Sequence, residues 1–211
     1  MGVFRKLRVT PQSARYYLFF AVLLIALPTL LSDLFPSHQG KILVASGAMN
    51  DTNFNKTIIY MTYHDFYGAS GFVVNRPLKG KILEETRKRF PKMEKFYYGG
   101  PVLYPYSYYW LVPLPDMQHG FEIVSPEQLE QELPDQYNAI ISNDDIAREV
   151  WVLHGYAAWG PMQLNREVFR SAAWDSIPFE RELMFNTPDD EKWYRALDKV
   201  LDEKKAALDA I

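Results

Sequence analysis

The chain has 211 residues, 48% of them hydrophobic and 23% charged, which is typical of one globular domain with a substantial core. This composition excludes disordered, collagen-like and disulfide-scaffold proteins, and the absence of cysteine excludes thiolate zinc sites and cysteine nucleophiles. Four of the 23 basic residues lie in the first fifteen positions. The rest of the chain has 19 basic and 26 acidic residues, and this excess of negative charge argues against nucleic-acid binding.

The chain begins with a basic segment and then an apolar one. We assign residues 1–15 to a basic N-terminal segment and residues 16–35 to a transmembrane helix, because residues 16–32 carry no charge. A cleaved signal peptide is the alternative, but no small-residue cleavage pattern follows the apolar run.

The distribution of charge around the apolar segment predicts a localisation. All four flanking cations precede the segment. The positive-inside rule then predicts a single-pass inner-membrane protein with a cytoplasmic N-terminus and a periplasmic domain. The mitochondrial inner membrane is the alternative, because Arg-rich, acid-free N-termini also occur in transit sequences.

After a linker at residues 36–40, residues 41–211 are expected to form an α+β domain, because strands and helices mix without regular βαβ alternation. Hydrophobic periodicity and capping residues set the expected elements. Strands are expected at residues 41–46, 57–63, 71–75, 106–112, 139–141 and 151–154, and helices at 82–90, 126–133, 143–149, from 160 onward and from 187 onward.

Three blocks of sequence carry a family resemblance. Residues 41–78, followed by Gly-Gly-Pro-Val at 99–102, form the first block, residues 155–164 the second, and residues 183–188 with Trp193 the third. In this order they resemble the YqgE/AlgH family. The resemblance implies a bent mixed sheet that forms a pseudo-barrel with flanking helices. It implies no established reaction, although some members are labelled transcriptional regulators.

The first candidate binding residues lie around the end of an expected strand. Pro77 forces an extended backbone on Arg76, which follows Asn75, so the direction of the Arg76 side chain is fixed. Arg76 can tie down carbonyl groups at the sheet rim or recognise an anion through its fork of donors. Asn53 can stabilise a turn or belong to a polar cluster that lines a site.

Two histidines and a glycine pair are further candidates. His64 and Asp65 could act as a base and its orienting group, but solvent-facing loop positions are favoured, and His154 is expected in the core or at a strand end. Gly99 and Gly100 indicate a turn with positive φ, or else a nest of amides that binds an anion. No sequence spacing indicates a metal site or a cofactor.

Aromatic residues are concentrated between positions 96 and 110, where eight of fifteen residues are Phe, Tyr or Trp. A strand buries alternate positions, so some of these rings are expected to point away from the core. Tyr106, Tyr108 and Trp110 are therefore candidates for a partner surface, with core packing as the alternative.

These features favour a membrane-anchored, non-enzymatic interaction module, an accessory subunit or scaffold whose partners are other membrane-complex proteins. One alternative is a hydrolase or small-ligand-binding protein that uses His64, Asp65, Arg76 and His154, which would have to converge in one apolar-walled pocket. The other is a transcriptional regulator, which requires a basic surface. No catalytic, cofactor-binding or metal-binding residue is assigned.

Overall fold

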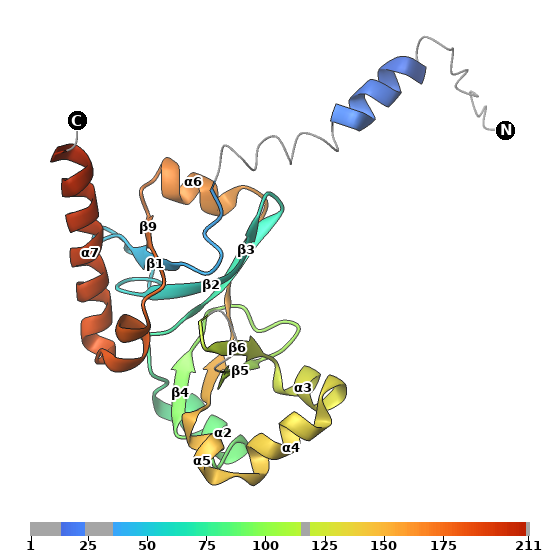
Figure 1. Cartoon of the computed structure of the whole chain (residues 1–211), viewed down its shortest axis with the longest axis vertical. Coiled ribbons are helices and arrows are strands. Elements are labelled where there is room, and N and C mark those ends of the chain that lie inside the picture. Colours follow the sequence, from blue (N-terminus) through green and yellow to red (C-terminus); the bar gives the residue numbers. More distant parts are fainter. Residues whose placement is uncertain (1–13, 24–35, 115–118, 210–211) are drawn as a thin grey trace. The chain divides into compact units, whose positions relative to one another are not determined.

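The structure is a computed structural model that describes residues 14–23, 36–114 and 119–209 (Figure 1). The chain divides into two units, Met1–Ser37 and His38–Ile211. In the first unit, residues 14–23 form a helix. The second unit contains the α+β domain expected at residues 41–211.

The prediction of a transmembrane helix over residues 16–35 is corrected. Residues 14–23 are helical, whereas residues 24–35 lie outside the described residues. Within the described parts of the chain, no helix is long and apolar enough to cross a membrane, since a span requires about 20 apolar residues. The single-pass localisation, in a bacterial inner membrane or a mitochondrial one, is therefore wrong.

The first sheet has five strands in the order β8-β3-β2-β1-β9, and every neighbouring pair is antiparallel. Its centre is apolar because all four residues of β1 are buried. The strands are β1 (Ile42–Ala45), β2 (Ile58–Asp65), β3 (Gly68–Val73), β8 (Ala157–Trp159) and β9 (Trp174–Ile177).

The second sheet has four strands in the order β4-β7-β5-β6. The β4–β7 pair is parallel and the other two pairs are antiparallel. The strands are β4 (Lys95–Tyr98), β5 (Tyr108–Pro113), β6 (Phe121–Val124) and β7 (Trp151–His154). The α+β class and the mixed pairing are confirmed, but the strands form two sheets instead of one bent sheet.

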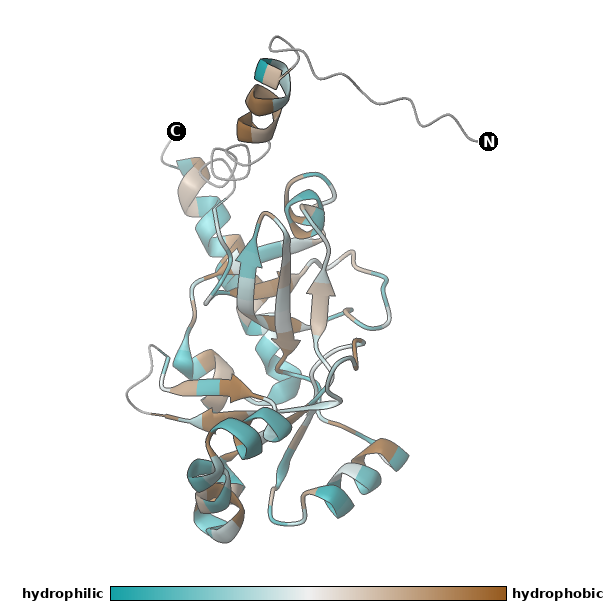
Figure 2. Cartoon of the chain, turned by 90° about the vertical axis from the view of Figure 1, so that its right-hand side faces the viewer, coloured by the Kyte–Doolittle hydropathy of each residue, from teal (hydrophilic) through white to brown (hydrophobic). Residues whose placement is uncertain are grey.

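Helices cover both sheets and present polar residues outward, while apolar residues concentrate in the strands (Figure 2). The helix α7 packs against β1, β2 and β9, and α6 packs against β3 and β9. The helices are α2 (Gly80–Arg89), α3 (Pro126–Glu132), α4 (Pro134–Ser142), α5 (Asp144–Glu149), α6 (Gln163–Phe169) and α7 (Asp189–Asp209), with a π-helical turn η1 (Glu182–Asn186) before α7.

One expected strand is a helix. The residues 139–141 lie in α4, which begins with Pro134 in its first turn and buries Ile140. Three apolar residues in a row fit a strand and a helix equally well, and the proline at the helix start decides between them. The short strands β4, β6, β8 and β9 were not expected, because, unlike the equally short β1 and β7, they lack a continuous run of buried apolar residues.

The second sheet separates two apolar clusters. Along its strands, Tyr97, Leu111 and Trp151 belong to the cluster shared with the first sheet. The alternate positions Phe96 and Trp110 belong to a second cluster, which includes residues of α3, α4 and α5. This alternation is the period of two of a strand. It gives the second sheet two faces with different surroundings.

Candidate functional site

Arg76 binds the backbone of the loop that connects β1 and β2. Its Nη1 atom donates to the carbonyl oxygens of Thr52, at 3.1 Å, and Asn53, at 2.7 Å. Its Nη2 atom donates to the Asn55 carbonyl at 2.8 Å, and its guanidinium lies 5.7 Å from the centre of the Tyr98 ring. This is the carbonyl-tying arrangement that the sequence allowed, and anion recognition by Arg76 stays a prediction.

Asn53 and Asn75 also make hydrogen bonds at this loop. The side chain of Asn75 accepts from the Ile58 amide at 2.9 Å and donates to the Lys56 carbonyl at 3.0 Å. Asn53 accepts a hydrogen bond of 3.2 Å from the Tyr98 hydroxyl. The structure thus brings Asn53, Asn75 and Arg76 together, beside a shallow hollow that Asn53 and Arg76 line.

His64 is buried, which corrects the expectation that it faces solvent. It is 5% exposed because β2 continues to Asp65 and directs His64 inward. Its Nδ1 atom accepts the His38 amide at 2.9 Å and is therefore unprotonated, and its Nε2 atom lies 3.1 Å from Asn165 Oδ1. The Asp65 carboxylate instead accepts from the amides of Tyr67 and Gly68 and closes the β2–β3 turn.

His154 ends β7, as expected for a strand-end histidine, and burial lowers its pKa. Its carbonyl oxygen accepts the amides of Gly99, at 2.8 Å, and Gly100, at 3.3 Å. Both amides of the expected nest are therefore already bonded. His64 contacts Asn165 and His38, whereas Arg76 binds the loop between β1 and β2 and His154 pairs with Tyr98 across the second sheet. The hydrolase hypothesis stays a prediction.

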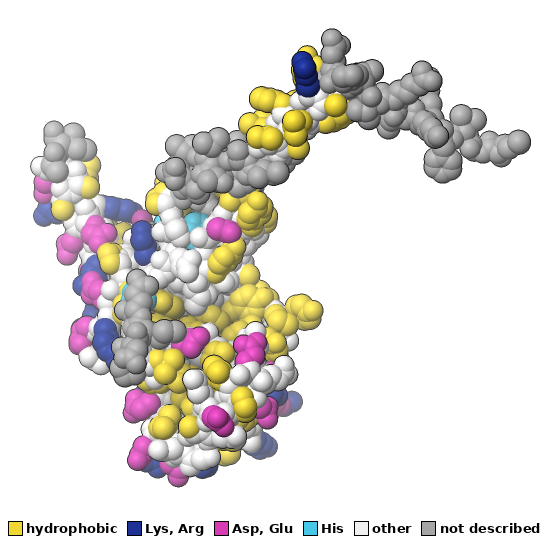
Figure 3. Space-filling model, turned by 45° about the vertical axis from the view of Figure 1, so that its right-hand side comes forward, with side chains coloured by type: hydrophobic (Ala, Val, Ile, Leu, Met, Phe, Trp, Pro, Cys, Tyr) yellow, Lys and Arg dark blue, Asp and Glu magenta, His cyan; other side chains and the backbone are white. Residues whose placement is uncertain are grey.

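The aromatic candidates divide between core and surface. Tyr108 and Trp110 are buried, at 8% and 0% exposure, because helices cover this face of β5. They are therefore not available to a partner's surface, whereas Tyr106 is half-buried. The exposed apolar residues of this region are Leu103, at 46%, and Tyr104, at 82%. Figure 3 shows apolar side chains gathered in the middle of one face of the domain.

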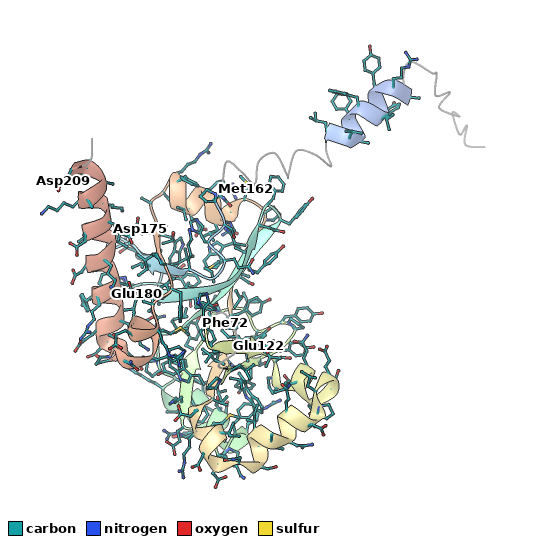
Figure 4. All side chains as sticks on the ribbon, viewed as in Figure 1. Phe72, Glu122, Met162, Asp175, Glu180 and Asp209 are labelled. Carbon is teal, nitrogen blue, oxygen red and sulfur yellow. The ribbon has the colours of Figure 1, made fainter. Side chains whose placement is uncertain are left out.

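The glycines mark a close backbone crossing between the two sheets. A Cβ atom at Gly99 would lie 2.2 Å from the carbonyl oxygen of Gly155, and one at Gly155, where φ is +72°, would lie 2.3 Å from that of Gly100. Phe72, labelled in Figure 4, packs at the same place, 3.2 Å from the Cβ position of Gly99. Only glycine fits at such an approach.

A pocket of about 350 Å³ opens between the second sheet and the helices that cover it. Its lining residues come from the end of α2, from β5, and from α3, α4 and α5. The apolar lining residues are Phe90, Met93, Trp110, Tyr137, Ile141 and Ala147, with prolines 91 and 126. We call this the Trp110 pocket.

Trp110 contributes a buried ring and an unused donor to this pocket. Its ring lies parallel to that of Tyr137, with centres 5.5 Å apart and 4° between the planes, and Phe90 packs edge-on at 5.7 Å. The indole Nε1 atom is buried and has no hydrogen-bond partner among the described residues. An unpaired buried donor costs about 1–3 kcal/mol.

The charged residues of the Trp110 pocket are largely paired. Arg89 Nη2 lies 3.0 Å from Glu127 Oε1, and Lys92 Nζ lies 2.9 Å from Asp144 Oδ1. The second oxygen of Glu127 is buried without a partner in the part of the chain that the structure describes. Trp110 and Glu127 therefore each keep one buried polar atom unpaired among the described residues.

The opposite face of the second sheet borders a second cleft, whose most buried polar group is Lys192. Its Nζ atom donates to Asp189 Oδ1 at 2.6 Å and to the Val74 carbonyl at 3.2 Å, and it lies 4.9 Å from the centre of the Trp151 ring. Burial lowers the pKa of Lys192, against the opposing effect of Asp189. Burial also raises the pKa of Tyr97, beside the same lysine.

Comparisons with known proteins place this geometry in a family. The sequence model described as AlgH-like (DUF179) matches residues 42–204. The chain belongs to this AlgH-like family. The match covers the domain with both sheets and confirms the family expected from the three sequence blocks.

Individual relatives agree with this assignment. A UPF0301 protein of Coxiella burnetii is 32% identical over 171 residues, covering 73% of this chain and 84% of the relative. A UPF0301 protein of Hahella chejuensis is 31% identical over 174 residues, covering 81% and 92%. The solution structure of the AlgH protein from Pseudomonas aeruginosa matches with a TM-score of 0.54 at 25% identity, over 77% of this chain and 87% of that one. None of these names states an activity.

Sequence reasoning missed two parts of this AlgH-like domain. Lys192 stands next to Trp193 within the apolar stripe of α7 and three residues after Asp189, a spacing that indicates an ion pair on a buried helix face. Glu127 carried no comparable signal, because a glutamate in the first turn of a helix is ordinary. Only the packing of α3 against β5 places it beside the Trp110 pocket.

Proposed function

We propose that this AlgH-like domain is a non-enzymatic binding protein whose recognition site for a small molecule is the Trp110 pocket. Small-molecule sites are concave and mostly apolar and carry a few polar groups that orient the ligand. The Trp110 pocket has this composition, with aromatic and aliphatic walls and the charged residues Arg89, Lys92, Glu127 and Glu130 in its lining. This combination of apolar walls and a few polar groups is the observation that carries the proposal.

Trp110 differs from three of the other four tryptophans of the chain. Trp159 and Trp174 each donate to Glu167 Oε2 at 2.9 Å, and Trp193 donates to the Ala45 carbonyl at 2.8 Å. Trp110 is fully buried, yet its indole has no acceptor within the described residues. An unpaired buried donor costs stability, so the Trp110 ring at this pocket is not placed there for the stability of the fold alone.

A thermal-shift screen of small aromatic compounds on the full chain tests this proposal. The matched variant is Ile141→Trp, because Ile141 is 36% exposed at the pocket wall and a larger ring there narrows the pocket. We expect compounds that raise the melting temperature of the wild type and not of Ile141→Trp. If every stabilising compound acts equally on both proteins, the Trp110 pocket is not the site.

A second candidate function is the protein-interaction module that the sequence favoured. The exposure of Leu103 and Tyr104 supports it, since exposed apolar groups beside half-buried aromatics are typical of partner surfaces. In a pull-down with the full chain as bait, Leu103→Ser with Tyr104→Ser should lose a partner that Ile141→Trp retains. Equal recovery of every partner by both variants would contradict a role for this surface.

A further inference from the structure

We infer that the cleft on the other face of the second sheet is a further binding site, for a small organic molecule that carries one carboxylate on an aromatic ring. We call it the Arg181 cleft. Its volume is about 510 Å³, and its lining includes residues of β4, β5, β7, η1 and α7. The inference concerns a site other than the Trp110 pocket and does not rest on the proposed function.

The guanidinium of Arg181 is exposed, and contacts on the cleft wall hold it in place. Its Nη1 atom donates to the His119 carbonyl at 3.2 Å, and its Cζ atom lies 5.0 Å from the centre of the Phe185 ring. Gly120, where φ is +77°, leaves room for the guanidinium, because a Cβ atom there would lie 2.7 Å from Nη1. Phe185 and Gly120 line the same cleft. A guanidinium fixed in this way binds a ligand with little further loss of side-chain freedom.

The charges of the cleft favour a ligand with a single negative charge. Two of the three cations in its lining already have carboxylate partners. Lys95 Nζ lies 3.0 Å from Glu149 Oε2, and Lys192 Nζ lies 2.6 Å from Asp189 Oδ1. Arg181, the third cation, makes no ion pair with any residue that the structure describes, and its one hydrogen bond there goes to a carbonyl. Its fork of N–H donors matches a carboxylate, which can accept two parallel hydrogen bonds.

A row of aromatic rings begins at Arg181 and favours a ring as the body of the ligand. The centre of the Phe185 ring lies 5.3 Å from that of Trp151, and Trp151 stacks on Tyr97 with centres 4.6 Å apart. All three rings line the cleft, and Phe185 and Tyr97 are half-buried, so part of their surface is open to a ligand. Aromatic surfaces bind planar rings by offset stacking and apolar contact. A carboxylate attached to a ring can therefore bind the guanidinium and the rings together.

Four probes test the ligand class on the full chain by calorimetry: benzoate, benzamide, acetate and phenyl phosphate. Benzamide lacks the charge and acetate lacks the ring, so each should bind about tenfold more weakly than benzoate. Phenyl phosphate should bind no more tightly than benzoate, because a single cation of the cleft lacks a partner among the described residues. Absence of benzoate binding would overturn the inference, as would tighter binding of any other probe.

Two substitutions in the cleft should change the benzoate affinity in opposite directions. Arg181→Gln removes the guanidinium and should weaken benzoate about tenfold, and Arg181→Lys should also weaken it, because an ammonium cannot reproduce the fork. Glu149→Gln removes a carboxylate and leaves Lys95 unpaired, so it should strengthen benzoate binding about threefold. Weaker binding by Glu149→Gln would contradict the role of charge in this cleft.

Two matched controls locate the binding. Arg166→Gln removes the same charge from an exposed position on α6, outside the cleft, and Ile141→Trp narrows the Trp110 pocket. Both variants should bind benzoate as the wild type does. Equal affinity in Arg181→Gln and Arg166→Gln would overturn the inference. Loss of benzoate binding in Ile141→Trp but not in Arg181→Gln would also overturn it, and would instead support the Trp110 pocket as the binding site.

Discussion

The two faces of the second sheet differ in whether their buried polar groups have interaction partners. On the face toward η1 and α7, Lys192 is 2% exposed, and its ammonium has a carboxylate, a carbonyl and an aromatic ring as neighbours. On the face toward α3 and α4, Trp110 and Glu127 each keep a buried atom unpaired among the described residues. The partners of a paired buried group offset its desolvation, whereas an unpaired buried group costs stability.

The largest effect on stability is expected when Lys192 loses the carboxylate that pairs with it. Asp189→Ala leaves the Lys192 ammonium buried without a carboxylate, which should lower the free energy of unfolding by about 3 kcal/mol. Lys192→Met removes the charge itself and should cost less than Asp189→Ala. Urea unfolding of both variants, with Asp190→Ala as the exposed control, measures the difference. Equal losses for Asp189→Ala and Asp190→Ala would show that the ion pair contributes nothing.

The next effect compares a paired indole with the unpaired one. Trp174→Phe leaves Glu167 without one of its donors and should cost about 2 kcal/mol or more, through the lost hydrogen bond and a small cavity. Trp110→Phe also leaves a cavity, but it removes an unsatisfied group, so it should cost about 1 kcal/mol less. Thermal unfolding of the ligand-free proteins measures both costs. A larger loss of stability for Trp110→Phe than for Trp174→Phe would indicate that the Trp110 indole has a hydrogen-bond partner.

A similar buried group lies beside the first sheet in His38, which precedes β1 and whose Nε2 atom has no partner in the described structure. Burial, assisted by His64 and Lys41, lowers the pKa of His38 from 6.5 to about 4. Between these values the unfolded chain binds the proton and the folded chain does not. The stability should therefore fall as pH falls from about 6.5 to about 4, by about 2 kcal/mol after allowance for solvent screening.

Denaturant unfolding at a series of pH values measures this dependence. His38→Phe keeps an aromatic ring of similar size but cannot titrate, so its stability should change less over the same pH range. The nearby His64 stacks on His38 with ring centres 5.1 Å apart and is unchanged in this variant. An identical pH dependence in the wild type and His38→Phe would assign the effect to another group.

The smallest effect on stability is expected for Arg76, whose hydrogen bonds hold the loop between β1 and β2 and do not involve the buried polar groups of the second sheet. Arg76→Lys cannot reproduce three bonds to the 52–55 carbonyls and should lower the free energy of unfolding by about 1 kcal/mol. Arg76→Ala should do the same or slightly more. Because these bonds are structural, binding of the compounds found in the thermal-shift screen, measured per folded molecule, should stay at the wild-type value. Loss of binding in the folded variants would give Arg76 a recognition role.

Much of the fold could be predicted from local sequence. The buried run at residues 42–45, the caps of α3 and α7, and the glycine blocks are local signals, and the structure places strands, helices and a backbone crossing there. The expected strand at 139–141 failed because three apolar residues lack a distinguishing period. The expected span over residues 16–35 failed because, within the described residues, no helix is long and apolar enough to cross a membrane.

The candidate site depended on tertiary structure. The sequence determined that aromatic residues are concentrated around β5 and that alternate positions face opposite sides. It did not determine which side meets solvent, because that depends on where α2 to α5 pack. Val74 and Lys192, which share a hydrogen bond, and Trp110 and Glu127, which line one pocket, are far apart in the chain and come together only after folding. Whether a buried polar atom is paired is therefore decided by the tertiary structure, since its partner comes from another element.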